Sequence, residues 1–152
     1  MAEVVLAKEI DKHGTELIIK FGPTLGSTPV VPVFLHEYAA HIEKGFAYNY
    51  MIASNMSKVI YATIGGEVAG FIIFDYQNDI PKTLWINFGA VVDKYKNRGI
   101  YSILHRHLEK SAKANGSKKI HSFVHINNTA MLEASKKIGK QPVFYRVEMD
   151  IE

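Results

Sequence analysis

Three basic side chains lie close together in front of a stretch with helical periodicity. Lys94, Lys96 and Arg98 precede Gly99, and over residues 100–112 the apolar side chains recur at every third or fourth position. The first turn of a helix has unpaired backbone N–H groups and a partial positive charge, and glycine lets a ligand approach the backbone closely. The stretch is therefore predicted to bind an anion, and a ligand with several phosphate groups suits three cations.

The elements that must hold this turn are a strand before it and a helix after it. The run from Thr83 to Val92 is rich in aromatic and β-branched residues, which favours a strand. The helical pattern ends at Asn115-Gly116, a common C-terminal signal. The expected unit is thus a strand, a basic glycine-containing turn and a helix.

These residues resemble two motifs of the GNAT superfamily of N-acyltransferases. Lys96-Asn97-Arg98-Gly99-Ile100-Tyr101, after a strand that ends Ala90-Val91-Val92, resembles the loop that binds the pyrophosphate of acyl-CoA. Downstream, Asn128, Met131 and Ile138-Gly139 resemble the second motif, in which an asparagine opens a helix and a hydrophobic residue with glycine closes it. The resemblance covers the chain from about Val59 to the C-terminus.

The resemblance implies acetyl-CoA, or another acyl-CoA, as cosubstrate, with no metal. The residues implied in its binding are Ala90, Val91, Val92, Lys96, Asn97, Arg98, Gly99, Ile100, Tyr101, Asn128 and Met131. Asn128 could also simply cap its helix. Gly89 lies inside the strand, and we interpret it as the place where the strand opens and its backbone pairs with the pantetheine arm; the alternative is a bend over a crowded core.

The sequence departs from the family pattern at four positions. Lys96 replaces glutamine or arginine and keeps the charge, whereas Tyr101 replaces a small residue of the phosphate loop. Ser135 stands where many members have a tyrosine that protonates the departing thiolate, and Lys140 stands where phenylalanine is common.

The implied reaction is direct attack of an amine on the thioester, because the chain has no cysteine to carry an acyl group. Backbone N–H groups near residues 90–92 would polarise the thioester carbonyl. Asn87 could orient a water molecule. Our hypothesis for the base is His125, because a histidine side chain ordinarily has a pKa in the range that suits proton transfer near neutral pH. The alternative is that His125 is a buried or capping histidine. Ser135 either relays a proton to the thiolate or packs its helix.

The implied fold class is α/β of the α+β type: a GNAT-like, mixed and mostly antiparallel central sheet with helices on both faces. The pattern predicts strands, helices and turns along the rest of the chain. Strands are expected over Glu3–Lys8, Glu16–Phe21, Val59–Thr63, Val68–Tyr76, Lys119–His125 and Val143–Ile151, and helices from Thr28-Pro29 or about Val33 and over Asn128–Ile138. The first two strands would form a hairpin or stand apart, Gly65-Gly66 predicts a hairpin, and the strand at Lys119 should run parallel to that at Thr83.

Aromatic and histidine residues outside these motifs are given structural roles. Five aromatic residues between Phe34 and Tyr50 are expected to be mostly core, with one or two lining the substrate cleft. His36 and His41 are five apart and so lie on different helix faces, which excludes a zinc-protease helix. His121 and His125 share a strand face, but the sequence offers no third metal ligand.

Composition sets the broad class of protein. A chain of 152 residues with 47% hydrophobic and 22% charged residues is expected to be one domain, residues 1–152. A net charge of +3 is too weak to indicate nucleic acid as a partner. No membrane span or signal segment is visible, so we expect a cytoplasmic protein. A homodimer is possible through the edge strand expected at Val143–Ile151.

Two other functions stay open at this point. A catalytically inactive GNAT-like module that binds acyl-CoA or a protein partner would explain the strand without a carboxylate, Tyr101 and Ser135. A protein associated with nucleic acid would show steep salt dependence of binding.

Overall fold

The computed structural model describes residues 3–46, 53–78, 81–143 and 147–151. Among these, six strands form one sheet in the order β1-β2-β3-β4-β5-β6. Their bounds are β1 Val4–Ile10, β2 Glu16–Gly22, β3 Lys58–Ile64, β4 Glu67–Gln77, β5 Thr83–Val91 and β6 Lys119–Ser122. The helices are α1 Val30–Glu43, α2 Ile100–Ala114 and α3 Thr129–Lys137, with short 3-10 turns at Leu25–Ser27 and Asp93–Tyr95.

The strand pairing confirms the predicted mixed sheet. Neighbouring strands from β1 to β5 are antiparallel, and β6 pairs with β5 in parallel after the α2 crossover. Of the two arrangements left open for the first strands, the structure has the hairpin. Gly65 and Gly66 both have positive φ, of 57° and 83°, as a tight hairpin turn requires.

Helix α1 begins at Val30, between the two starts that the sequence allowed. Pro29 is the cap residue rather than the first helical residue, and the Val30 N–H donates to the Thr28 hydroxyl oxygen at 3.2 Å. Pro32 is tolerated inside the first turn because the N–H that it lacks would have no partner within the helix.

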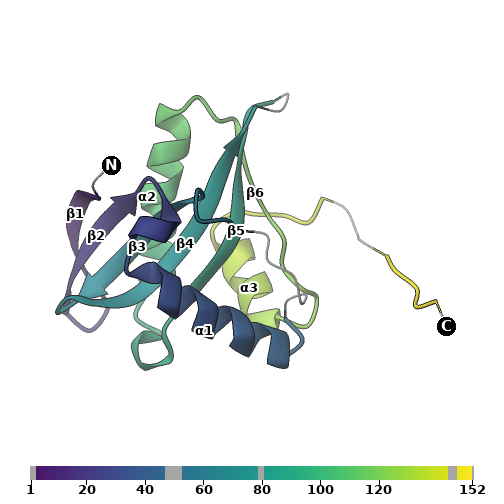
Figure 1. The fold of residues 1–152 in the computed structure, drawn as a ribbon, viewed down its shortest axis with the longest axis horizontal. Helices are drawn as coiled ribbons and strands as arrows, with labels where there is room; N and C mark the ends of the chain where they lie inside the picture. Colours follow the sequence, from purple (N-terminus) through teal and green to yellow (C-terminus); the bar gives the residue numbers. More distant parts are fainter. Residues whose placement is uncertain (1–2, 47–52, 79–80, 144–146, 152) are drawn as a thin grey trace.

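The sheet carries one apolar core on each face, which confirms helices on both faces (Figure 1). On one face, α2 packs through Ile100, Ile103, Leu104 and Leu108 against alternate residues of the strands. On the other face, α1 contributes Val30 and Phe34. The alternation of side chains along β4 and β5 therefore separates an α1 side from an α2 side.

The final strand predicted over Val143–Ile151 is wrong for the residues that the structure describes there. Residues 143 and 147–151 belong to no strand, and the C-terminal segment leads away from the sheet (Figure 1). The alternation of apolar and acidic residues favours a strand, but a strand also needs a partner to complete its hydrogen bonds. Val147 and Ile151 are 88% and 82% exposed, so this segment has no apolar surface beneath it. The predicted homodimer stays a prediction.

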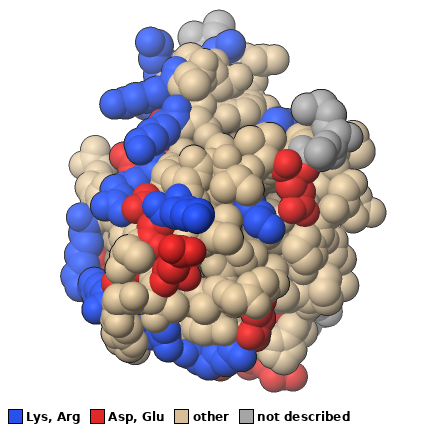
Figure 2. All heavy atoms as spheres, turned by 90° about the vertical axis from the view of Figure 1, so that its left-hand side faces the viewer, with Lys and Arg blue, Asp and Glu red and all other residues tan. Residues whose placement is uncertain are grey.

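Charges of both signs are mixed over the surface on the β1–β2 side of the molecule. Figure 2 shows lysine and arginine side chains next to aspartate and glutamate there, rather than a continuous basic surface. Among the described residues, no helix has the length and hydropathy needed to cross a membrane.

Candidate active site

Strands β5 and β6 part halfway along β5. The two strands pair from Thr83 with Lys119 to Ile86 with Ser122, where β6 ends, three residues before the strand end that we predicted. Beyond that point β5 continues to Val91, paired with β4. No described strand pairs with the other edge of this second half of β5. That edge can therefore offer backbone donors and acceptors to a ligand.

The irregularity in β5 lies at Asn87, not at Gly89. The register shifts between Ile73–Phe88 and Phe74–Ile86, so Asn87 has no partner on β4 and forms a bulge. Gly89 stays in register with Ile72. A Cβ at Gly89 would lie 3.2 Å from the ring atom Cε2 of Tyr101, so this glycine also makes room for α2.

The basic turn leads directly into the N-terminus of α2. Asn97 and Gly99 have positive φ, of 65° and 79°, and Gly99 is the cap residue. Within the described part of the chain, the N–H groups of Ile100, Tyr101 and Ser102 have no hydrogen-bond acceptor. Three free N–H groups and the helix dipole make this end of α2 suitable for a phosphate.

Each of the three predicted cations is paired with a carboxylate. Lys94 Nζ lies 2.8 Å from Glu67, Lys96 Nζ lies 2.8 Å from Asp93, and the Arg98 guanidinium lies 3.4 Å from Asp11. The first two pairs are exposed, and exposed pairs contribute about 0–1 kcal/mol. A phosphate group can therefore replace these carboxylates as the partner of Lys94 and Lys96 at a small cost in free energy.

A fourth cation reaches the turn from the β1–β2 hairpin. Lys12 donates its backbone N–H to the Arg98 carbonyl at 3.0 Å, and its side-chain stem would lie 3.2 Å from a Cβ at Gly99. No local signal in the sequence indicates Lys12, because the contact joins segments far apart in the chain. Its ammonium adds positive charge beside the α2 N-terminus.

Asp11 fixes the hairpin to the basic turn and should make stability depend on pH. Burial opposes ionisation, but the N–H groups of Thr15 and His13 and the Arg98 guanidinium together hold the pKa of Asp11 below its usual value. A lowered folded pKa contributes stability above the unfolded pKa of about 3.9, and this is lost as pH falls through the folded value. We expect Asp11→Asn to be less stable than wild type at pH 6, with the difference shrinking below about pH 4. Urea denaturation between pH 2.5 and 6 measures this, and a difference independent of pH would contradict it.

Of the five aromatic residues between Phe34 and Tyr50, Phe34 lies in the core and Tyr38 packs half-buried against it, so the expectation that most of the five are core stays a prediction. Phe34 is buried, and its ring lies 5.6 Å from that of Phe88 and 5.7 Å from that of Tyr38. Phe46 contacts His41 at 6.0 Å. Tyr48 and Tyr50 lie outside the described residues.

A shallow hollow of about 330 Å³ lies between α1 and the start of the basic turn. Its polar lining comes from His36 and Glu37 of α1, Glu67 of β4 and Asp93. The carboxylates of Glu67 and Asp93 pair with Lys94 and Lys96, so the hollow borders the basic turn rather than forming a separate charged site.

A row of polar and aromatic side chains crosses the α1 side of the sheet next to the bulge. Asp75 of β4 pairs with Trp85 of β5, which pairs with His121 of β6, so the three share one face. The Asn87 amide donates to Asp75 Oδ2 at 2.6 Å, and the Ser57 hydroxyl donates to the same oxygen at 2.8 Å. The structure thus places a carboxylate at the bulge.

Sequence reasoning missed Asp75 because it looked for a carboxylate on β5 itself. Asp75 is 12 residues before Asn87, on the neighbouring strand. An available signal was a charged residue between Phe74 and Tyr76 inside an otherwise apolar strand pattern.

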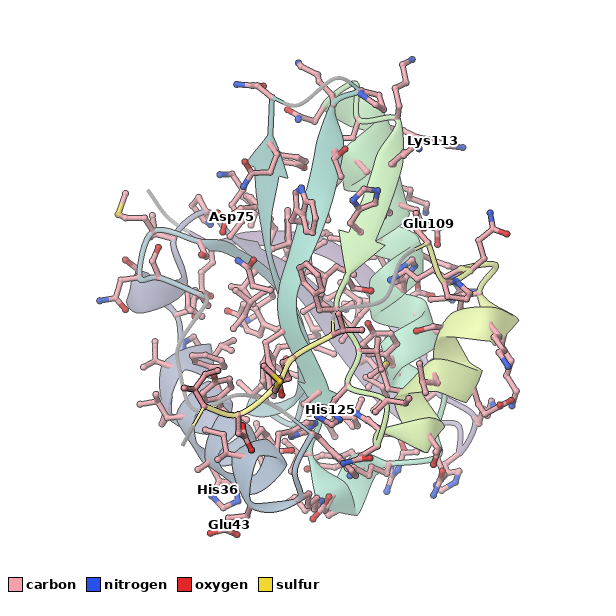
Figure 3. The ribbon with its side chains drawn as sticks, turned by 90° about the vertical axis from the view of Figure 1, so that its right-hand side faces the viewer. His36, Glu43, Asp75, Glu109, Lys113 and His125 are labelled. Atoms are coloured by element: carbon pink, nitrogen blue, oxygen red, sulfur yellow. The ribbon has the colours of Figure 1, made fainter. Side chains whose placement is uncertain are left out.

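The other predicted site residues lie in or around α3. The Asn128 side chain accepts the Met131 N–H at 3.2 Å, which confirms its capping role. His125 lies in the turn after β6, where its Nδ1 accepts the Asn127 N–H at 3.0 Å. In Figure 3, His125 and Asp75 lie at clearly different levels along β5. Ser135 is half-buried on α3. The role of His125 as a base stays a prediction.

Lys140 lies in a partly buried cluster with two side chains of α2. Its Nζ donates to the Ser122 hydroxyl oxygen at 3.2 Å, and His105 and Glu109 interact with it electrostatically. Burial lowers the pKa of Lys140 to about 8. The His105 ring is buried, and burial lowers its pKa as well. Lys140 is therefore a cation at a position that is poorly suited to hold one.

Replacing Lys140 by phenylalanine should stabilise the protein near neutral pH. The folded pKa lies below the unfolded value of about 10.4, so the unfolded chain binds more protons and stability rises with pH between about 8 and 10.4. After allowance for partial exposure, Lys140→Phe should raise the free energy of unfolding by about 1–2 kcal/mol at pH 7, and by less at pH 10. Urea denaturation at the two pH values measures this, with the exposed Lys137→Phe as control. A loss of stability at pH 7 would show that the ammonium is favourably held.

Comparison with known proteins agrees with the strand, turn and helix arrangement. The model of the Acetyltransferase (GNAT) family matches residues 30–139, so the chain belongs to this family of acetyltransferases, which use acetyl-CoA as cosubstrate. No curated protein sequence matches the chain.

Solved structures share the fold, and two of the three given below are named as acetyltransferases. A ribosomal-protein-alanine N-acetyltransferase from Brucella melitensis biovar Abortus 2308 superposes with a TM-score of 0.69 at 13% identity, covering 89% of this chain and 99% of that one. An aminoglycoside acetyltransferase from an uncultured soil metagenomic sample has a TM-score of 0.65 at 14% identity, covering 90% and 99%. A mutant of the BH1408 protein from Bacillus halodurans has a TM-score of 0.70 at 16% identity, covering 89% and 99%. At these identities the likeness establishes the fold.

Proposed function

We propose that this protein is an N-acyltransferase that transfers an acyl group, in the first instance acetyl, from acyl-CoA to an amine of a small molecule or peptide. The observation that carries the proposal is the opening between β5 and β6, which leads to the free N–H groups at the start of α2. One edge of β5 can bind an extended amide-bearing arm, and the α2 N-terminus can bind its phosphates. The proposal treats residues 1–152 as one domain.

On this proposal, the CoA pyrophosphate binds to the N–H groups of Ile100, Tyr101 and Ser102. Lys12 and Arg98 add positive charge, and Lys96 exchanges its exposed pairing with Asp93 for a phosphate oxygen. The pantetheine arm runs along the unpaired edge of β5 toward the bulge at Asn87. Residues 90–92, which we expected to polarise the thioester carbonyl, then lie at the phosphate end of the arm, and backbone groups of β5 nearer the bulge take that role. Tyr101, which lies against Gly89, must then share this path with the arm.

The reaction needs no covalent enzyme intermediate, since the chain has no cysteine. The ammonium ion first loses a proton to water, and the neutral amine then attacks the thioester carbon. The carbonyl oxygen takes up negative charge, the C–S bond breaks as the C–N bond forms, and the second proton of the nitrogen passes through solvent to the thiolate. Backbone N–H groups of β5 stabilise the oxyanion. The thiolate leaves readily because an alkyl thiol has a pKa of about 8.5, so a proton relay through Ser135 would help without being required.

The first test is calorimetric titration with acetyl-CoA. We expect micromolar binding by wild type and at least about a tenfold loss in the variant with Lys96→Ala and Arg98→Ala, because two phosphate contacts disappear. The matched control is Lys110→Ala with Lys113→Ala, which removes two cations from the far end of α2. Release of free thiol from acetyl-CoA in the presence of primary amines then measures transfer. Absence of binding by wild type at millimolar acetyl-CoA would contradict the proposal and favour a protein-interaction module.

A further inference from the structure

The face of the sheet opposite α2 presents a carboxylate next to an aromatic surface. Asp75, Trp85 and His121 form a row across β4, β5 and β6, one residue before β5 and β6 part. The Trp85 and His121 rings lie 4.8 Å apart, and the Phe123 ring stacks on Trp85 at 5.5 Å with an interplanar angle of 26°. Phe123 is 66% exposed, so this aromatic surface faces solvent.

The Asp75 carboxylate is held by its neighbours and still has acceptor capacity. The Asn87 amide and the Ser57 hydroxyl both donate to Oδ2, at 2.6 and 2.8 Å. Among the described residues, no hydrogen bond or ion pair uses Oδ1. Ser57 is 1% exposed, so its hydroxyl group holds the carboxylate from the buried side. A held carboxylate with one free oxygen is suited to bind an ammonium group.

The position of Asp75 relates this carboxylate to the reaction. Asn87, its hydrogen-bond partner, is the bulge residue at the point where the β5 edge becomes free. The phosphates bind on the side of α2, so the opposite face remains for the amine. Trp85 and Phe123 can contact the carbon atoms next to the ammonium, and aromatic faces also attract cations.

We propose that this row is the acceptor subsite and that it selects a monoamine with an aromatic or apolar body. Asp75 binds the ammonium group, which loses a proton to water before the neutral amine attacks the thioester, and the Trp85–Phe123 surface binds the body. An acceptor with several ammonium groups would need several carboxylates, and Asp75 is the one acidic residue of the row. In Figure 3, Glu43 of α1 lies at the lower end of the molecule, well away from Asp75. This inference rests on the proposed function and names the substrate class of the same site.

The experiment uses 2-phenylethylamine as monoamine and spermidine as polyamine, with acetyl-CoA as donor. We expect kcat/KM to be at least about tenfold higher for 2-phenylethylamine. Asp75→Asn keeps the size of the side chain and should lower kcat/KM for this amine by about 100-fold, because the ammonium loses its partner. Glu133→Gln, an exposed carboxylate of α3, is the matched control and should change it less than twofold.

Two further readouts separate a local effect from misfolding. Phe123→Ala should raise KM for 2-phenylethylamine about fivefold and leave KM for ethylamine unchanged. Trp85 is the one tryptophan of the chain, so its fluorescence should respond to 2-phenylethylamine in wild type without acetyl-CoA and not in Asp75→Asn. Acetyl-CoA affinity, measured by calorimetry, should be the same in all these variants.

Preference for spermidine, or unchanged kcat/KM in Asp75→Asn, would overturn the subsite. Failure of the proposed function itself looks different, because wild type would then bind no acetyl-CoA, or would release no thiol from it with any primary amine.

Discussion

Replacing Gly99 by valine is expected to weaken acetyl-CoA binding by about 100-fold or more. Gly99 has a φ of 79° and caps α2, and a side chain there would meet the Lys12 stem at 3.2 Å. Valine would hinder the approach of a phosphate to the first N–H groups of α2 and would disturb the left-handed backbone conformation. Calorimetric titration with acetyl-CoA measures the loss.

Gly116 provides a matched control at the other end of the same helix. It has the same φ of 79°, and a Cβ there would meet no atom within 4 Å. Both valine variants should lose about 1–3 kcal/mol of stability from backbone strain. Only Gly99→Val should lose affinity for acetyl-CoA. A comparable loss of affinity in Gly116→Val would mean that the effect is general destabilisation and not loss of the anion site.

Replacing Phe71 by alanine is expected to have the largest effect on stability, about 3–5 kcal/mol. Phe71 is fully buried on the α1 side, where its ring packs edge-on against Phe34 at 6.3 Å and lies 6.0 Å from Phe88. The substitution would leave a cavity beneath α1 and remove two aromatic contacts. This is a large part of the stability of a typical domain, which is about 5–15 kcal/mol.

Chemical denaturation of Phe71→Ala and of Phe123→Ala tests this expectation. Phe123 is 66% exposed, so its removal should change the free energy of unfolding by less than about 1 kcal/mol. Equal losses in the two variants would show that the aromatic cluster under α1 is not the core of that face.

The elements around the basic turn could be predicted because their signals are local. The strand at Thr83, the glycine turn and the helix of residues 100–114 each follow from periodicity, turn residues and caps within a few positions. The hairpin at Gly65-Gly66 and the Asn128 cap are equally local. Such signals also define which face of each element is apolar, whereas the arrangement with helices on both faces of the sheet was implied by the resemblance to the GNAT superfamily.

The features that the sequence did not reveal depend on long-range contacts. Arg98 pairs with Asp11, 87 residues away, and nothing near Arg98 indicates that its charge is matched. Asp75 lies beside the bulge because β4 pairs with β5 in one particular register. Predicting this contact requires that register, and not only the positions of the two strands in the sequence. The prediction of the final strand was wrong for the same reason. Apolar and acidic residues do alternate over residues 147–151, but the segment itself does not indicate which strand it would pair with.

The central claim is that acyl-CoA lies in the opening between β5 and β6 with its phosphates at the α2 N-terminus. The most direct measurement is a crystal structure of the protein with acetyl-CoA. We predict pyrophosphate oxygens within hydrogen-bond distance, about 2.7–3.2 Å, of the N–H groups of Ile100, Tyr101 or Ser102, and the thioester beside Asn87. Phosphates bound away from α2, or a pantetheine arm outside the opening, would contradict the account.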